Sequence, residues 1–160
     1  MFDFNNFVMK SIIEKPLPLP LVYVSNGVVE LHDYVVLPRK NEIWGIFSGD
    51  LYYNLVIDKS VTWSQETSKS RAYTIGGKSL TLPTLQQLSA AFIQKEMFNR
   101  TIEILCYLGL KADKWSDDLF CALDVDFESE IVGAFNMQKG CAEKVHFSNS
   151  ELCARLALSP

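Results

Sequence analysis

The residues with the richest chemistry in this sequence are two histidines, His32 and His146, and four cysteines. Nucleophilic catalysis requires a base held against the nucleophile, and a Cys–His pair such as Cys141 with His146 has no local motif to support it. Neither histidine lies in a recognisable catalytic motif, so we expect both to be ordinary polar positions. The sequence therefore predicts no catalytic residue, and a small thiol- or histidine-dependent enzyme remains an alternative hypothesis.

The cysteines have no Cys-x-x-Cys spacing, which argues against a zinc or thioredoxin-like site. We expect them to be small apolar residues in or near the core. Their disulfide state stays open, and Cys121 and Cys153 are the first pair to test because both lie in strand-like segments. The other two are Cys106 and Cys141.

Acidic residues gather late in the chain, and Asp124 and Asp126 are spaced to share one face of a strand. Carboxylates that converge in this way are weak candidates for calcium ligands. A solvated acidic strand face is the favoured interpretation, so we predict no metal and no cofactor.

Ligand contacts are expected where aromatic and polar side chains fall in loops, since loops on a rigid scaffold often carry recognition. Trp44 lies beside the charged segment 39–42, whereas Trp63 and Trp115 are expected in the core. The candidate ligand-binding residues are Trp44, Asp117, Asp118, Phe120, Asn136, Gln138 and Lys139.

The elements that would position these residues begin with a strand-rich region. Residues 21–24 and 28–31 predict a hairpin around Asn26-Gly27, because this pair tolerates the positive φ angles of tight turns. Further strands are expected at 34–37, 43–47 and 51–57. Residues 1–20, rich in phenylalanine and then in alternating prolines, predict an N-terminal arm or linker ahead of one domain over residues 21–160.

The middle of the chain predicts helices. Thr62 and Thr84 each precede a glutamine by three residues, the spacing of a capping box. We expect helices over 63–73 and from residue 85, with a continuation or short third helix over 97–108. Alternating patterns then predict strands at 121–128, 131–137 and 143–147 and a last one near the C-terminus. Strands at both ends with two central helices make an α+β order.

The motif order resembles a known family. Trp63 opens a helix, residues 82–85 read Leu-Pro-Thr-Leu, residues 115–118 read Trp-Ser-Asp-Asp, and Arg155 lies in the closing strand. Over about residues 21–158 this resembles bacterial domains related to the C-terminal domain of collagen-like adhesins, which are similar to the C-type-lectin-like fold. Formylglycine-generating enzymes and hypervariable phage receptor-binding proteins also use that fold.

The resemblance implies a C-type-lectin-like fold and a cell-surface or secreted location, and its short motifs bear on fold more than on function. The family's Trp-Arg before Leu-Pro-Thr is Leu80-Thr81 here, and the Ser-Thr of its Trp-Ser-Ser-Thr motif is Asp117-Asp118. The paired active-site cysteines of the formylglycine-generating enzymes have no counterpart here. The sugar-binding triplets of animal C-type lectins are also missing.

Charge and hydropathy narrow the function further. With 15 Lys+Arg against 19 Asp+Glu and no basic run, the chain lacks the footprint of a nucleic-acid binder. No apolar run is long enough to span a membrane and no signal peptide is recognisable, so a cytoplasmic location is expected unless a signal was removed. The sequence thus predicts a non-catalytic module that binds a glycan or protein ligand. A structural subunit that forms homo-oligomers through the arm is another alternative.

Overall fold

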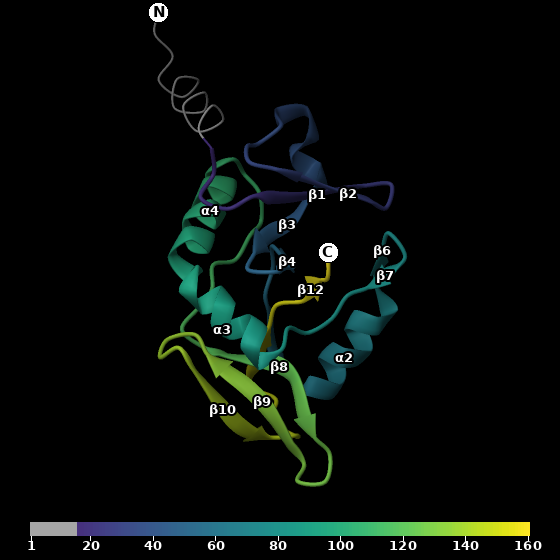
Figure 1. Cartoon of the computed structure of the whole chain (residues 1–160), viewed down its shortest axis with the longest axis vertical. Coiled ribbons are helices and arrows are strands. Elements are labelled where there is room, and N and C mark those ends of the chain that lie inside the picture. Colours follow the sequence, from purple (N-terminus) through teal and green to yellow (C-terminus); the bar gives the residue numbers. More distant parts are fainter. Residues whose placement is uncertain (1–15) are drawn as a thin grey trace, which may run out of the picture.

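The computed structural model describes residues 16–160, which form two five-stranded sheets with helices on both sides (Figure 1). The first sheet has the order β12-β4-β3-β1-β2. Its strands are β1 (Leu21–Ser25), β2 (Val28–His32), β3 (Ile43–Ser48), β4 (Leu51–Asn54) and β12 (Ala157–Leu158). The second has the order β10-β9-β8-β11-β5. Its strands are β5 (Asp58–Val61), β8 (Leu119–Asp126), β9 (Ile131–Asn136), β10 (Cys141–His146) and β11 (Leu152–Ala154).

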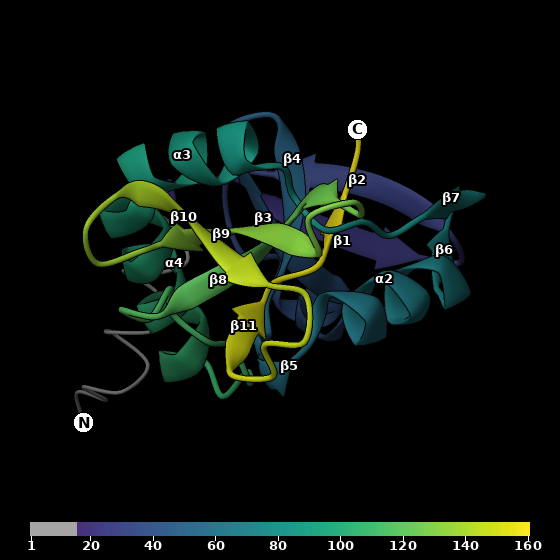
Figure 2. The same ribbon diagram turned by 90° about the horizontal axis from the view of Figure 1, so that it is seen from below.

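Three α-helices and a 3-10 helix complete the described elements, together with a short hairpin of β6 (Thr74–Ile75) and β7 (Lys78–Ser79). The helices are η1 (Leu37–Glu42), α2 (Trp63–Ala72), α3 (Leu85–Ile93) and α4 (Lys95–Tyr107). α2 lies on one side of the strands and α3 and α4 lie on the other (Figures 1 and 2). The α+β class is therefore confirmed, with three central α-helices instead of two.

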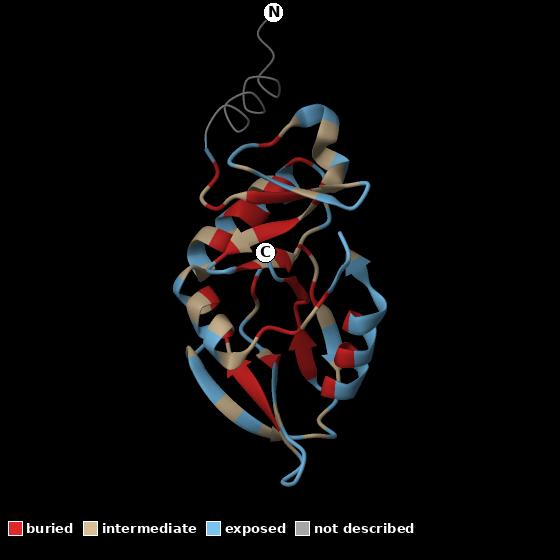
Figure 3. Cartoon of the chain, turned by 45° about the vertical axis from the view of Figure 1, so that its right-hand side comes forward, coloured by how far each residue is buried: buried red, intermediate tan, exposed pale blue. Residues whose placement is uncertain are grey.

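The C-terminal segment connects the two sheets, because β11 pairs with β8 and β5 whereas β12 pairs with β4. Its side chains alternate between two hydrophobic clusters, as the period of extended chain requires. Cys153 and Ala157 join the larger cluster, while Ala154, Leu156 and Leu158 join the smaller one. Buried residues accordingly follow the central strands and the inner sides of the helices (Figure 3).

Arg155 lies within this segment and is only 1% exposed. Its guanidinium carbon lies 4.5 Å from the centre of the Trp115 ring and 4.8 Å from that of Phe98. Its two terminal nitrogens donate to the carbonyls of Asn54 and Asp113. Stacking and these hydrogen bonds offset part of the cost of burying the charge, and burial lowers the pKa of Arg155 to about 9.

Local signals explain most of the elements. Asn26 and Gly27 adopt φ angles of 51° and 76°, and β1 pairs with β2 around them. Thr62 and Thr84 both form complete capping boxes, with Gln65 and Gln87 respectively. A cap of this kind contributes about 1 kcal/mol, which helps α2 in particular because its apolar face is weak.

Two predicted strands are wrong in detail. Residues 34–37 form no strand, because the Val36 amide donates to the Tyr23 hydroxyl at 2.8 Å and η1 begins at Leu37. The strand predicted over 51–57 ends at Asn54, whose side-chain oxygen accepts the amide of Val56 at 2.9 Å. This side chain turns the backbone away from the ladder, and the chain re-enters a sheet only at β5.

The predicted arm is only partly described, since residues 1–15 lie outside the described residues. Its last part belongs to the domain: Leu17 and Leu19 are buried in the larger cluster. The Leu17 amide also donates to the Asp33 carbonyl at 2.8 Å, and the Pro20 carbonyl accepts the amide of Phe47. Packed apolar side chains therefore continue from residues 17–20 into β1, and the division at residue 20 stays a prediction.

All four cysteines lie among the described residues and are free. Cys153 is opposite Phe120 in the parallel pairing of β11 with β8, so Cys121 projects from the other face of the sheet. Cys121 and Cys153 accordingly belong to different hydrophobic clusters. Adjacent strands with side chains on opposite faces cannot bridge this pair without moving the backbone.

Candidate functional site

A pocket of about 240 Å³ lies between α2 and the first sheet, and we call it the Trp44 pocket. Its wall consists of Trp44, Asn54, Val56, Asp58, Lys69, Tyr73, Leu80 and Leu156. Aromatic and aliphatic side chains form most of the lining, with one amide and one pair of opposite charges. This is the composition expected of a site for a small ligand with both apolar and polar groups.

Two neighbouring strands and the C-terminal segment build one side of the pocket. Trp44 lies in β3 and Asn54 in β4, where Asn54 pairs with Gly45. The Trp44 carbonyl accepts the amide of Leu55, and the Asn54 amide donates to Leu156. Because backbone hydrogen bonds fix these positions, the pocket floor is held before any ligand arrives.

The other side of the pocket comes from α2 and the hairpin after it. Lys69 lies in the last turns of α2, and Tyr73 follows at the C-terminus of this helix and is 56% exposed. The β6–β7 turn packs against the β1–β2 turn, and a side chain on Gly76 would come within 2.8 Å of the Gly27 carbonyl. This close approach ties the segment after Tyr73 to the first sheet.

The charged end of the pocket consists of the Asp58 carboxylate and the Lys69 ammonium group, and the Glu66 carboxyl lies beside Asp58 without being part of the lining. Lys69 Nζ lies 2.7 Å from Asp58 Oδ2, an ion pair that joins α2 to β5. Glu66, one helical turn before Lys69, is 2% exposed, and its Oε2 atom has no hydrogen-bond partner in the structure. Burial and then the neighbouring Asp58 carboxylate raise the pKa of Glu66 to about 7.

Of the predicted ligand-binding residues, only Trp44 contributes to this pocket. Sequence patterns did not point to Asp58, Lys69 and Tyr73 in the pocket wall, nor to Glu66 beside them. A signal was present: α2 buries Glu66, Thr67 and Ser70, which are polar residues on the side of a helix where apolar ones are usual. A capped helix with polar residues on its buried face is a pattern that could have drawn attention to them.

The other predicted residues gather at the start of β8 and the turn between β9 and β10. Lys95 Nζ bridges them, lying 2.9 Å from Asp117 Oδ1 and 2.7 Å from the Met137 carbonyl. Asn136 uses its side-chain oxygen to accept the amides of Gln138 and Lys139. The Asn136 Oδ1 atom therefore stabilises the turn between β9 and β10 through these two hydrogen bonds.

Two members of this group differ in their exposure. Asp118 is exposed and its carbonyl accepts the amide of Met137. Phe120 is 0% exposed and its ring contacts Trp115 with centroids 4.8 Å apart. Phe120 therefore belongs to the core and cannot contact a ligand at the surface.

The two weak metal candidates have structural roles. Asp124 Oδ1 accepts the amide of Leu85 at 2.9 Å, where α3 begins. Asp126 Oδ1 accepts the amides of Glu128 and Ser129 in the turn after β8. Among residues 16–160, no group of three His, Cys, Asp or Glu side chains is placed to hold a metal ion.

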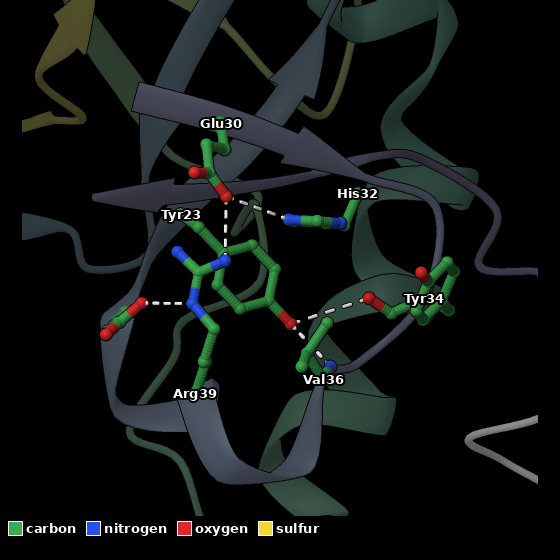
Figure 4. A network of polar contacts seen from close by, with 7 residues as sticks. Tyr23, Glu30, His32, Tyr34, Val36 and Arg39 are labelled. Carbon is green, nitrogen blue, oxygen red and sulfur yellow. Dashed lines mark hydrogen bonds and ion pairs between the residues drawn. The ribbon is translucent and has the colours of Figure 1, made fainter. Parts of the chain in front are cut away.

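The histidines also have local partners. His146 Nδ1 lies 2.7 Å from the Ser148 hydroxyl, and Cys141 is at the opposite end of β10. His32 lies 3.2 Å from Glu30, beside Arg39 and the Tyr23 ring (Figure 4). The structure therefore separates Cys141 from His146, which lie at the two ends of the same strand.

Comparison with known proteins adds no relative. No family model matches the chain, and neither a curated protein nor a solved structure matches it significantly. In the part of the chain that the structure describes, no helix has the length and apolar character needed to cross a membrane. The C-type-lectin-like fold stays a prediction, and the function must be argued from the Trp44 pocket itself.

Proposed function

We propose that this protein is a non-catalytic binding module that holds one sugar ring of a glycan in the Trp44 pocket. The observation that carries this proposal is the composition of the pocket wall. Trp44, Tyr73, Leu80 and Leu156 provide apolar surface, and Asn54, Asp58 and Lys69 provide polar groups in the same pocket of about 240 Å³.

A sugar ring needs this combination because it has apolar C–H faces and a rim of hydroxyl groups. Aromatic side chains give a large, rigid contact surface for such a face. Carboxylate, amide and ammonium groups together can accept from and donate to hydroxyls, and each costs free energy if a ligand leaves it unpaired. The pocket is smaller than the usual range for drug-sized ligands, which favours a single ring.

The proposed site differs from the loop site expected from the sequence, because helix and strand residues contribute to its wall. Four of the eight residues that line the Trp44 pocket, including its amide and both of its charged groups, come from regular elements, namely β3, β4, β5 and α2. A site built on such elements changes shape less on binding than one built on loops. We therefore expect glycan binding with little change in backbone structure.

The test is titration of the protein with neutral monosaccharides and their methyl glycosides, followed by calorimetry and amide chemical shifts. Binding by the unchanged protein should weaken at least about tenfold in Trp44→Ala, since each 1.4 kcal/mol of lost contact is a factor of ten. Phe127→Ala is the matched control, because Phe127 is an exposed ring outside the pocket. Equal weakening in both variants, or no binding of any sugar, would overturn the proposal.

A further inference from the structure

Three aromatic rings meet at one end of the second sheet, and we call them the Phe127 cluster. Trp63 comes from the start of α2, Phe127 from the turn between β8 and β9, and Phe147 from the segment after β10. The Phe127 ring centroid lies 5.6 Å from that of Trp63 and 6.1 Å from that of Phe147, and the latter two are 5.7 Å apart. Aromatic rings at these distances attract one another, so each ring stabilises the position of the other two.

The Phe127 cluster leaves apolar surface in contact with water. Phe127 is 65% exposed, whereas Trp63 is 8% exposed. Leu123, whose carbonyl accepts from Trp63 Nε1 at 3.3 Å, is 39% exposed. One exposed apolar side chain is ordinary, but several that adjoin one another mark an interaction surface. The turn that carries Phe127 forms the lower end of the described chain in Figure 1, where a partner can reach it.

Hydrogen bonds hold this turn in place. Asp126 Oδ1 accepts two backbone amides of the turn, and the Phe147 amide donates to the Glu130 carbonyl at 2.8 Å. A side chain that is positioned before binding loses little conformational entropy when a partner covers it. Phe127 therefore has the properties of an anchor residue in a protein interface, where a few aromatic side chains contribute most of the binding energy.

The surroundings of Phe127 are acidic. Residues 124–130 contain no lysine or arginine and four carboxylates: Asp124, Asp126, Glu128 and Glu130. Lys144 lines an open hollow together with the first two of these and offsets part of their charge. Glu130 lies 3.5 Å from His146, which is charged only when protonated. The excess negative charge repels the phosphates of nucleic acids and of anionic lipids, and it attracts a cationic partner.

We propose that the Phe127 cluster docks a basic segment of another protein. Apolar side chains of that segment cover Phe127, and flanking lysines or arginines pair with Glu128 and Glu130. Burial of the aromatic ring supplies affinity, whereas the carboxylates supply orientation and select against acidic partners. None of the three rings lines the Trp44 pocket, so this inference is independent of glycan binding.

The experiment titrates the full chain with two short synthetic peptides, one repeating Lys-Leu-Gly and the other repeating Glu-Leu-Gly. The peptides have the same apolar content and opposite charge. The basic peptide should shift the amide resonances of residues 123–130 and 145–148 and bind at least about tenfold more tightly than the acidic one. Its affinity should fall in 0.5 M NaCl, because salt screens exposed charges.

Two sets of substitutions separate the aromatic and the acidic contributions. Phe127→Ala should weaken binding of the basic peptide by at least about tenfold. The double variant Glu128→Gln, Glu130→Gln should lose most of the preference for the basic peptide. The matched controls are Tyr107→Ala, an exposed ring at the end of α4, and Glu103→Gln, an exposed carboxyl. Both controls should bind the basic peptide as the unchanged protein does.

Three results would overturn the proposal. The first is equal binding of the two peptides, or of neither. The second is unchanged affinity for the basic peptide in Phe127→Ala. The third is binding to phosphatidylglycerol vesicles that is lost in Phe127→Ala, which would identify a membrane as the partner. Trow44→Ala is not needed for any of them, because the Phe127 cluster and the Trp44 pocket share no residue.

Discussion

Two polar clusters in this protein have nearly the same composition and opposite electrostatic behaviour. Arg39 pairs with Glu30 at 2.7 Å and with Glu42 at 2.6 Å in the cluster near η1 (Figure 4). Lys69 pairs with Asp58 at 2.7 Å in the Trp44 pocket, beside Glu66. Each cluster has one cation and two carboxyl groups.

The difference lies in where the second carboxyl sits. Glu30 is 44% exposed, and hydrogen bonds from Arg39 and then His32 hold its pKa below the usual range. Glu66 is 2% exposed, and burial raises its pKa to about 7. Solvent and hydrogen-bond donors therefore stabilise the ionised carboxylate of Glu30 in the first cluster. Burial destabilises the ionised form of Glu66 in the second cluster, so its neutral form is favoured.

The largest expected effect concerns Glu66→Gln and the pH dependence of stability. The pKa of Glu66 is higher in the folded state than its ordinary value of 4.5, so the folded protein binds more protons between pH 4.5 and about 7. Its contribution to stability is therefore lost as the pH rises through that window, by about 3 kcal/mol in total. In urea unfolding, the free energy of unfolding of Glu66→Gln relative to that of the unchanged protein should increase by that amount from pH 4.5 to pH 8.

The control for this comparison is Glu103→Gln, which replaces an exposed carboxyl. The difference in unfolding free energy between this variant and the unchanged protein should stay constant across the same pH range. A constant difference between Glu66→Gln and the unchanged protein across the same range would contradict the raised pKa. The contrast with the Arg39 cluster would then disappear.

A smaller effect is expected for Tyr23→Phe, which tests how much the hydrogen bonds of the Tyr23 hydroxyl stabilise the segment next to the Arg39 cluster. The Tyr23 side chain is buried, and its hydroxyl accepts the amide of Val36 and donates to the carbonyl of Tyr34. Removing the hydroxyl leaves a partly buried amide without its acceptor, which should cost about 1–2 kcal/mol in urea unfolding. Tyr34→Phe, with its exposed ring, should cost much less, and equal losses would show that the Tyr23 hydroxyl has no special role.

The smallest effect is expected for Arg39→Met, which removes both ion pairs of the exposed cluster. Exposed ion pairs contribute little because water screens them and holding long side chains costs entropy. The melting temperature should therefore fall only slightly, and 1 M NaCl should abolish the difference from the unchanged protein. A large loss that persists in high salt would mean that burial does not distinguish the two clusters.

Local patterns in the sequence determined many of the elements. The capping boxes at Thr62 and Thr84 placed the starts of α2 and α3, and Asn26-Gly27 placed the first hairpin. Trp63 and Trp115 are buried, as predicted. These predictions succeed because capping and tight turns depend on residues only a few positions apart.

Only the tertiary structure brought the Trp44 pocket together. Trp44, Asp58 and Lys69 come from β3, β5 and α2, and pairing of the C-terminal segment with both sheets brings these elements close to one another. Phe120 shows that tertiary structure can also remove a residue from a predicted site. It was expected at the surface, but it is completely buried where β8 pairs with β11. Sequence patterns fix which residues are neighbours along a helix or strand, whereas long-range packing decides which side chains share a pocket and which lose contact with water.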